Sequence, residues 1–186
     1  DYAAIMVGAG DRAPYLALAE QEGVAERCYW VDAVPNAVLP VWYTWCDCMC
    51  TPSRWEGFGI VFVEAAACGA AIVTSDIAPM NEFLRHDASA CLVPEYERPD
   101  AIARAIQRVC EDATYRRVLS EGALRAAVPF DRRLVDETEI AIYDEALRLR
   151  AWPTSLFRLS RASLFARRAI SIPSRVTRRV KRLLSA

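Results

Sequence analysis

The stretch 52–69 constrains the fold of this chain more than any other. It places two carboxylates eight positions apart, Glu56 and Glu64, with the turn Gly57-Phe58-Gly59 after the first and an apolar, alanine-rich run after the turn. The run predicts a helix, so Glu56 belongs to the loop before it and Glu64 lies about one turn inside it. The N–H groups and dipole of a helix start favour a bound phosphate, and glycines let it approach the backbone. Two carboxylates flanking a diphosphate predict a site for a nucleotide sugar.

This stretch resembles the E-x7-E signature of the retaining family 4 glycosyltransferases, which have the two-domain GT-B fold. The family pattern reads P-S-x-x-E-G-F-G-x-x-x-x-E-A-x-A-x-G, and every fixed position is present between Pro52 and Gly69. The resemblance extends over residues 2–148 and implies the C-terminal, donor-binding domain of that fold. A buried strand–helix unit with surface glutamates is the plain alternative.

The resemblance implies a role for each signature residue. Glu56 would contact hydroxyls of the donor sugar at the catalytic centre, and Glu64 would hold the ribose hydroxyls, for which a carboxylate is well suited. The amides of Gly57, Phe58 and Gly59 would meet the sugar and the distal phosphate. The further candidates are Val34 for the base, and Glu82, Gly8 and Gly10 near the ligand.

The chemistry implied is transfer of a sugar, with retention at the anomeric carbon, to a glycan or lipid-linked acceptor, as in polysaccharide biosynthesis. Attack from the front face needs no protein nucleophile, and the site stabilises the leaving diphosphate by positive charge and dipoles. We expect no metal and no cofactor besides the substrate. The chain departs from the family at Ala78-Pro79-Met80, where Gly-Gly is usual, so Glu82 is either a ligand contact or a solvated helix residue.

Short apolar runs alternate with helical patterns along the rest of the chain. Strands are predicted at 2–7, 28–31, 46–50, 71–74 and 90–93. Helices are predicted at 13–23, 37–44, 60–68, 80–85, 99–111, 113–127 and 132–149. This alternation predicts an α/β fold, a Rossmann-like parallel sheet with helices on both faces. We expect a donor-binding domain over 1–150 and a separate basic tail over 151–186.

The family's acceptor domain has no counterpart in these residues. Its first donor-domain strand, with the Arg/Lys pair that contacts the diphosphate, is also missing, and the chain begins inside an apolar run without Met. We therefore expect this chain to be an N-terminally truncated fragment that contains half of an active site. Such a fragment would be inactive alone and would need the missing N-terminal domain as its partner.

The seven cysteines show no paired spacing, which favours a reducing compartment over a disulfide framework. Cys46, Cys48 and Cys50 alternate and would share one face of a strand. We interpret them as small core side chains, since a zinc site would need a fourth ligand and the only histidine, His86, is expected in an exposed loop.

A basic segment ends the chain. All 24 acids lie at or before Glu145, whereas eleven basic residues and no acids follow from Leu147 onward. Between 175 and 184 the apolar residues have helical spacing with basic residues between them, which is typical of a helix on an anionic membrane surface. A disordered or partner-docking tail is the alternative, and nucleic acid is disfavoured because no stacking pattern or motif supports it.

Other functions compete with the transferase. Gly8-Ala9-Gly10-Asp11-Arg12-Ala13 is a G-x-G-x-x-A string after a predicted strand, and Asp32 closes the next strand, as in an NAD- or FAD-binding module. An NAD- or FAD-binding function would not explain the motif at residues 52–69. A non-catalytic GT-B half that serves as a scaffold is the second alternative. With no run of ~18 uncharged apolar residues and no secretory signal, we expect a cytoplasmic protein, peripheral on the inner face of the membrane.

Overall fold

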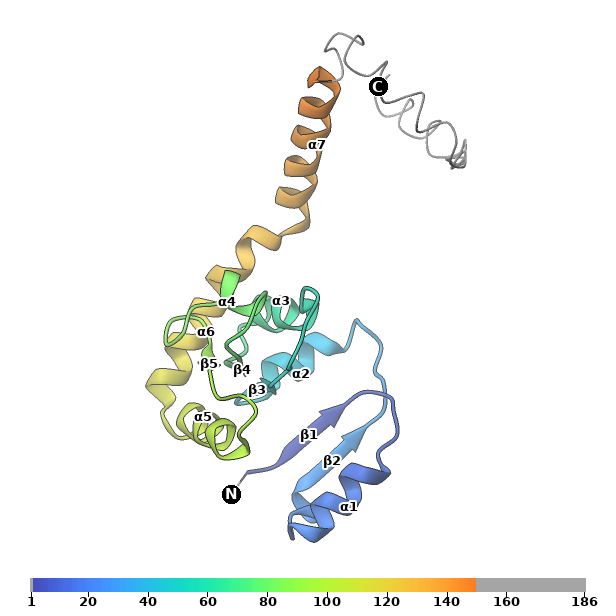
Figure 1. The fold of residues 1–186 in the computed structure, drawn as a ribbon, viewed down its shortest axis with the longest axis vertical. Coiled ribbons are helices and arrows are strands. Elements are labelled where there is room, and N and C mark those ends of the chain that lie inside the picture. Colours follow the sequence, from blue (N-terminus) through green and yellow to red (C-terminus); the bar gives the residue numbers. More distant parts are fainter. Residues whose placement is uncertain (1, 150–186) are drawn as a thin grey trace, which may run out of the picture. The chain divides into compact units, whose positions relative to one another are not determined.

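The computed structural model describes residues 2–149 (Figure 1). The elements in chain order are β1 (Ala4–Val7), α1 (Ala13–Gln21), η1 (Ala25–Arg27), β2 (Cys28–Val31), α2 (Leu39–Trp45), β3 (Met49–Thr51), α3 (Ile60–Ala67), β4 (Ile72–Ser75), α4 (Met80–Phe83), β5 (Cys91–Val93), α5 (Pro99–Glu111), α6 (Ala113–Ala127), η2 (Val128–Phe130) and α7 (Arg132–Leu149). The chain divides into two compact units, Asp1–Val135 and Asp136–Ala186, and the boundary falls within α7. The predicted basic tail, 151–186, lies outside the described residues.

All strand pairs are parallel, which confirms the predicted α/β class. The strands form two sheets, however, with the orders β1-β2 and β3-β4-β5. In the first sheet Ala4 lies opposite Cys28, and the pairing continues to Val7 opposite Val31. In the second, Met49 lies opposite Ile72, and Val73 lies opposite Cys91. A single parallel sheet was predicted. The division into two sheets could not be predicted, because strand patterns carry no information about which edges pair.

Helices cover both faces of the β3-β4-β5 sheet. Successive side chains of β4 point to opposite faces, so Ile72 and Val73 belong to different buried clusters. The Ile72 face packs on α3, α4 and α6 through Phe62, Ala65, Ala66, Met80, Leu84, Leu92 and Ala123. The Val73 face packs on α5 and α6 through Cys91, Val93, Ala101, Ala105, Val109, Tyr115 and Leu119. The signature helix α3 is therefore anchored to the sheet through Phe62, Ala65 and Ala66.

The predicted strand 46–50 is displaced in the structure. Helix α2 continues to Trp45, and the Cys46 amide still donates to the Trp42 carbonyl at 3.2 Å, so the strand begins only at Met49. Cys46 is thus a helix cap rather than a strand residue, and the predicted three-cysteine face was wrong. Cys48 and Cys50 pack against the Val73 cluster, as the core interpretation requires.

Helix α6 crosses very close to the turn before β5. A Cβ added at Gly122 would lie 1.7 Å from the Ala88 carbonyl oxygen, so only glycine permits this approach. The helix is capped at its start by Asp112, whose carboxylate accepts from the amides of Thr114 and Tyr115 at 3.0 and 2.9 Å. Among the helices of residues 2–149, none is long and apolar enough to cross a membrane.

Candidate functional site

The signature loop leaves the carboxyl end of β3 and turns into α3. The buried Thr74 hydroxyl donates to the Thr51 carbonyl at 3.0 Å, which joins the ends of β4 and β3 just before the loop. Gly59 precedes α3 in the left-handed conformation, with φ 75° and ψ 52°. A Cβ at this position would also lie 2.7 Å from the Phe62 ring, so the turn requires glycine for two separate reasons.

The loop holds Glu56 through a hydrogen bond within the signature itself. The Ser53 hydroxyl donates to Oε1 of Glu56 at 2.8 Å, and both residues are half-buried. A carboxylate accepts up to about four hydrogen bonds, so Glu56 keeps most of its capacity for a ligand. The predicted position of Glu56, in the loop before the helix, is confirmed. The contact with Ser53 was not predicted.

Glu64 lies on α3 and is held from another helix. The Tyr43 hydroxyl of α2 donates to Oε2 of Glu64 at 3.3 Å in a partly buried setting. Burial, together with the neighbouring Glu64 charge, raises the pKa of Tyr43 to about 12, so the phenol is a neutral donor at physiological pH. Each signature carboxylate therefore accepts one hydrogen bond from a hydroxyl group of the protein.

Phe58 is fixed by aromatic contacts. Its ring meets that of Phe130 edge to face at a centroid distance of 5.7 Å, and Phe130 meets Phe83 in the same manner at 5.3 Å. The pairs connect the signature loop to η2 and α4. Such contacts contribute about 0.5–1.5 kcal/mol each beyond burial. Phe130 follows Phe58 by 72 positions, and no sequence spacing predicted the contact.

The remaining predicted residues are distributed over other loops. Val34 is half-buried after β2, whereas Gly8 and Gly10 are exposed after β1. These three lie in the loops that follow the strands of the β1-β2 sheet. Around the turn between β3 and α3 lie Glu56, Gly57, Phe58, Gly59 and Glu64. Glu82 is an exposed residue of α4.

His86 is exposed, as expected, and has a structural role. Its Nδ1 accepts from the Leu92 amide at 3.1 Å, beside the turn residue Asp87. Asp87 in turn accepts from the Tyr115 hydroxyl at 2.6 Å and from Arg108 at 2.9 Å. Across residues 2–149, no three His, Cys, Asp or Glu side chains come together in a metal-binding arrangement.

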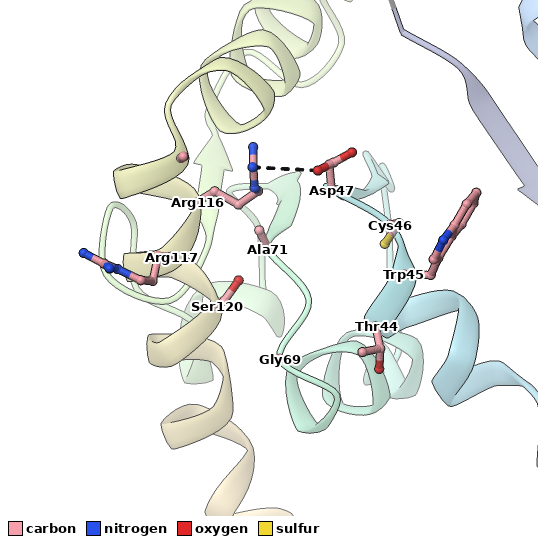
Figure 2. Close-up of a pocket in the computed structure, with 10 residues that line it drawn as sticks. Thr44, Trp45, Cys46, Asp47, Gly69, Ala71, Arg116, Arg117 and Ser120 are labelled. Atoms are coloured by element: carbon pink, nitrogen blue, oxygen red, sulfur yellow. Dashed lines mark ion pairs between the residues drawn. The ribbon is translucent and has the colours of Figure 1, made fainter.

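Two hollows in the described part lie away from the turn between β3 and α3. One, of about 370 Å³, is at the amino ends of β3 and β4 (Figure 2). There Arg116 faces Asp47 at 3.8 Å, and Arg117 also belongs to the lining. The other, of about 450 Å³, is apolar and is lined by Ile5, Tyr29, Val31, Val41, Trp42 and Trp45. Ligands of parallel sheets bind at the carboxyl ends of strands, so the signature turn remains the better candidate site.

Comparison with known proteins agrees with the sequence resemblance. The family model described as "Glycosyl transferases group 1" matches residues 1–125. A D-inositol 3-phosphate glycosyltransferase of Jonesia denitrificans is 32% identical over 124 residues, which make up 67% of this chain and 29% of that protein. A second protein of that name, from Salinispora tropica, is 34% identical over 132 residues, 70% of this chain and 27% of its own length. The chain thus spans less than a third of these relatives.

Solved structures share the fold at low sequence identity. Sucrose-phosphate synthase from Thermosynechococcus elongatus aligns with a TM-score of 0.72 at 23% identity, over 78% of this chain and 38% of that one. Anabaena Alr3699/HepE, solved in complex with UDP, aligns with a TM-score of 0.68 at 23% identity, over 77% of this chain and 41% of that one. The predicted fold class is confirmed.

Proposed function

Because the chain belongs to the group 1 glycosyl transferases, we propose that its described part binds the donor, a nucleotide sugar, at the turn between β3 and α3. In this proposal Glu56 contacts hydroxyls of the sugar and Glu64 contacts the ribose. The amides of Gly57, Phe58 and Gly59 meet the sugar and the distal phosphate, and Val34 contacts the base. Glu82, Gly8 and Gly10 are secondary candidates.

One observation carries the proposal: both carboxylates lie half-buried on either side of a helix start whose backbone is shaped by glycine. Helix N-termini favour phosphate because their first N–H groups have no intrahelical partner. Glu56 in the loop and Glu64 within the helix are then available for the two hydroxyl-bearing parts of the donor. A buried strand–helix unit without a ligand would have no use for two half-buried acids at such a turn.

The proposed reaction is sugar transfer with retention at the anomeric carbon. The departing diphosphate is stabilised by the dipole of α3 and by the amides of the turn, as charge develops on it. The acceptor hydroxyl oxygen bonds to the anomeric carbon from the face that the diphosphate leaves, and its proton passes to the departing diphosphate. No protein nucleophile is therefore required. This assignment of stereochemistry follows from the resemblance to the retaining family.

The complete active site, in this proposal, needs more protein than the chain contains. The chain spans 29% of the Jonesia denitrificans relative. We propose that an acceptor domain comes from an additional part of the full protein, and that the acceptor is a glycan or lipid-linked molecule. Contact of 151–186 with an anionic membrane remains a prediction.

Calorimetric titration of the chain with UDP, GDP, ADP and NAD tests the donor site. UDP is the first choice, since the Anabaena neighbour was solved with it. We expect one nucleoside diphosphate to bind selectively and Glu64→Ala to abolish that binding. Glu121→Ala is the matched control, because Glu121 is an exposed acid of α6 outside the signature.

The alternatives give different results in this titration. NAD binding that is indifferent to Glu64 overturns the proposal and favours a dinucleotide module built on Gly8-Ala9-Gly10. In such a module Asp32, which is ion-paired with Arg12, would be the expected ribose ligand. Binding by none of the four ligands contradicts the claim that the described part holds the nucleotide. Nucleotide binding without turnover in a protein of the relatives' full length supports a scaffold.

A further inference from the structure

Tyr43 is the one described residue outside the signature loop and its helix that is hydrogen-bonded to a signature carboxylate. Its ring packs against the buried cluster beneath α3, and its hydroxyl donates to Oε2 of Glu64 at 3.3 Å. The ring is thus held by packing while the hydroxyl reaches the acid. A group fixed in this way restricts the rotamers of the side chain that it contacts.

The hydrogen bond leaves room for a ligand. An ionised carboxylate has about four acceptor positions, and Tyr43 uses one of them. Oε1 of Glu64 and the second lone pair of Oε2 remain for the two hydroxyls of a ribose. Because the phenol keeps its proton, Tyr43 can donate to the Glu64 carboxylate, as the 3.3 Å contact shows.

We infer that Tyr43 is a positioning residue for Glu64 and that this pair makes the site selective for ribonucleotides over 2′-deoxyribonucleotides. The inference rests on the proposed function, because it requires that Glu64 face the ribose. Without the 2′-hydroxyl, one acceptor position of a half-buried carboxylate loses its partner on binding, which costs affinity. Without Tyr43, Glu64 samples other rotamers and the selectivity decreases.

The test compares the ribo and 2′-deoxy forms of UDP, GDP and ADP by calorimetry. We expect the unmodified chain to bind the selected ribonucleotide about tenfold more tightly or more, the effect of one hydrogen bond to a charged group. Tyr43→Phe keeps the ring and removes only the hydroxyl. It is expected to weaken ribonucleotide binding roughly tenfold while 2′-deoxyribonucleotide binding stays unchanged.

Two further variants complete the design. In a Glu64→Gln background, Tyr43→Phe is expected to have no additional effect on selectivity, since the two residues act as a unit. Tyr29→Phe is the matched control, because Tyr29 is an exposed tyrosine of β2 far from Glu64 in sequence.

The outcomes separate this inference from the proposed function. Equal losses for both sugar forms in Tyr43→Phe would show a merely structural role and overturn the inference. Equal affinities for both forms in the unmodified chain would overturn it too, while nucleotide binding and the proposed function stand. Binding of no nucleotide by the unmodified chain overturns both.

Discussion

Ser53 donates its hydroxyl to Oε1 of Glu56 at 2.8 Å, across one tight turn of the signature loop. Ser53, two residues beyond the end of β3, therefore orients the carboxylate that we assign to the donor sugar. Glu64 has the same kind of support from Tyr43 at 3.3 Å. The two acids are thus held independently, which makes their contributions separable by experiment.

Replacing Ser53 by Ala is expected to weaken binding of the nucleotide sugar about tenfold and to leave the nucleoside diphosphate unaffected. The reason is that Glu56 faces the sugar in the proposed site, and a hydrogen bond to a charged group has about this effect. Calorimetry with the two ligands measures the difference. Ser120→Ala, on α6, is the control, and an equal loss for both ligands would contradict the assignment.

Gly59→Ala is expected to lower the free energy of unfolding by about 2–3 kcal/mol, because a left-handed residue with Cβ and an overpacked contact each cost about 1–2 kcal/mol. The contact is with the Phe62 ring at 2.7 Å. Urea unfolding measures the change. Gly57→Ala is the matched control, since an added Cβ there meets nothing within 4 Å. Similar stability of both variants would show that the turn tolerates a side chain.

Gly122→Ala is expected to destabilise the chain by about 3 kcal/mol or more, although alanine is the better helix former by about 1 kcal/mol. The added methyl would collide with the Ala88 carbonyl oxygen, a backbone atom that has no rotamer to change. Thermal unfolding followed by circular dichroism gives the result, with Glu121→Ala in the same helix as control. An unchanged or higher Tm would contradict the claim that α6 needs glycine at position 122 to pass the Ala88 carbonyl.

Asp87→Asn is expected to flatten the dependence of stability on acidic pH. The hydrogen bond from Tyr115, with smaller contributions from His86 and Arg108, lowers the pKa of Asp87. A carboxyl whose pKa is lowered on folding stabilises the fold above its ordinary pKa of about 4, and this effect disappears as pH falls through the lower folded value. Asparagine also tolerates the φ of 59° at this position.

Measuring Tm at pH 7, 5 and 3 checks this expectation. The unmodified chain should lose more stability between pH 5 and 3 than the Asp87→Asn variant does. The contribution is modest because the Asp87 side chain is 47% exposed and therefore partly screened by solvent. Asp144→Asn, in α7, is the control, and identical pH profiles of the Asp87 variant and the unmodified chain would contradict the prediction.

The helices after β5 could be predicted from the sequence to the residue. Helices α5, α6 and α7 begin and end where they were expected, because Pro99 at a first turn and Asp112 as a cap are local signals. Strand β3 was misplaced, since the apolar run before it is compatible with helix or strand. Local patterns therefore predicted which helices and strands form. In the first half of the chain, however, they predicted only approximately where each one begins and ends.

The signature turn was also predictable, because its residues are close together in sequence. The contacts that hold it were not. Tyr43 precedes Glu64 by 21 positions, Phe130 follows Phe58 by 72, and neither pair has a characteristic spacing. The division of the strands into two sheets depends on edge pairing, which alternating patterns do not encode. What escaped prediction was tertiary contact between distant segments.

The division into two sheets has a practical consequence for handling this chain. Within residues 2–149, β1 pairs only with β2 and β3 pairs only with β4, so each has one side with unpaired N–H and C=O groups. Unpaired strand edges of this kind accept strands from other molecules. Purified alone, the chain should therefore self-associate more as its concentration rises.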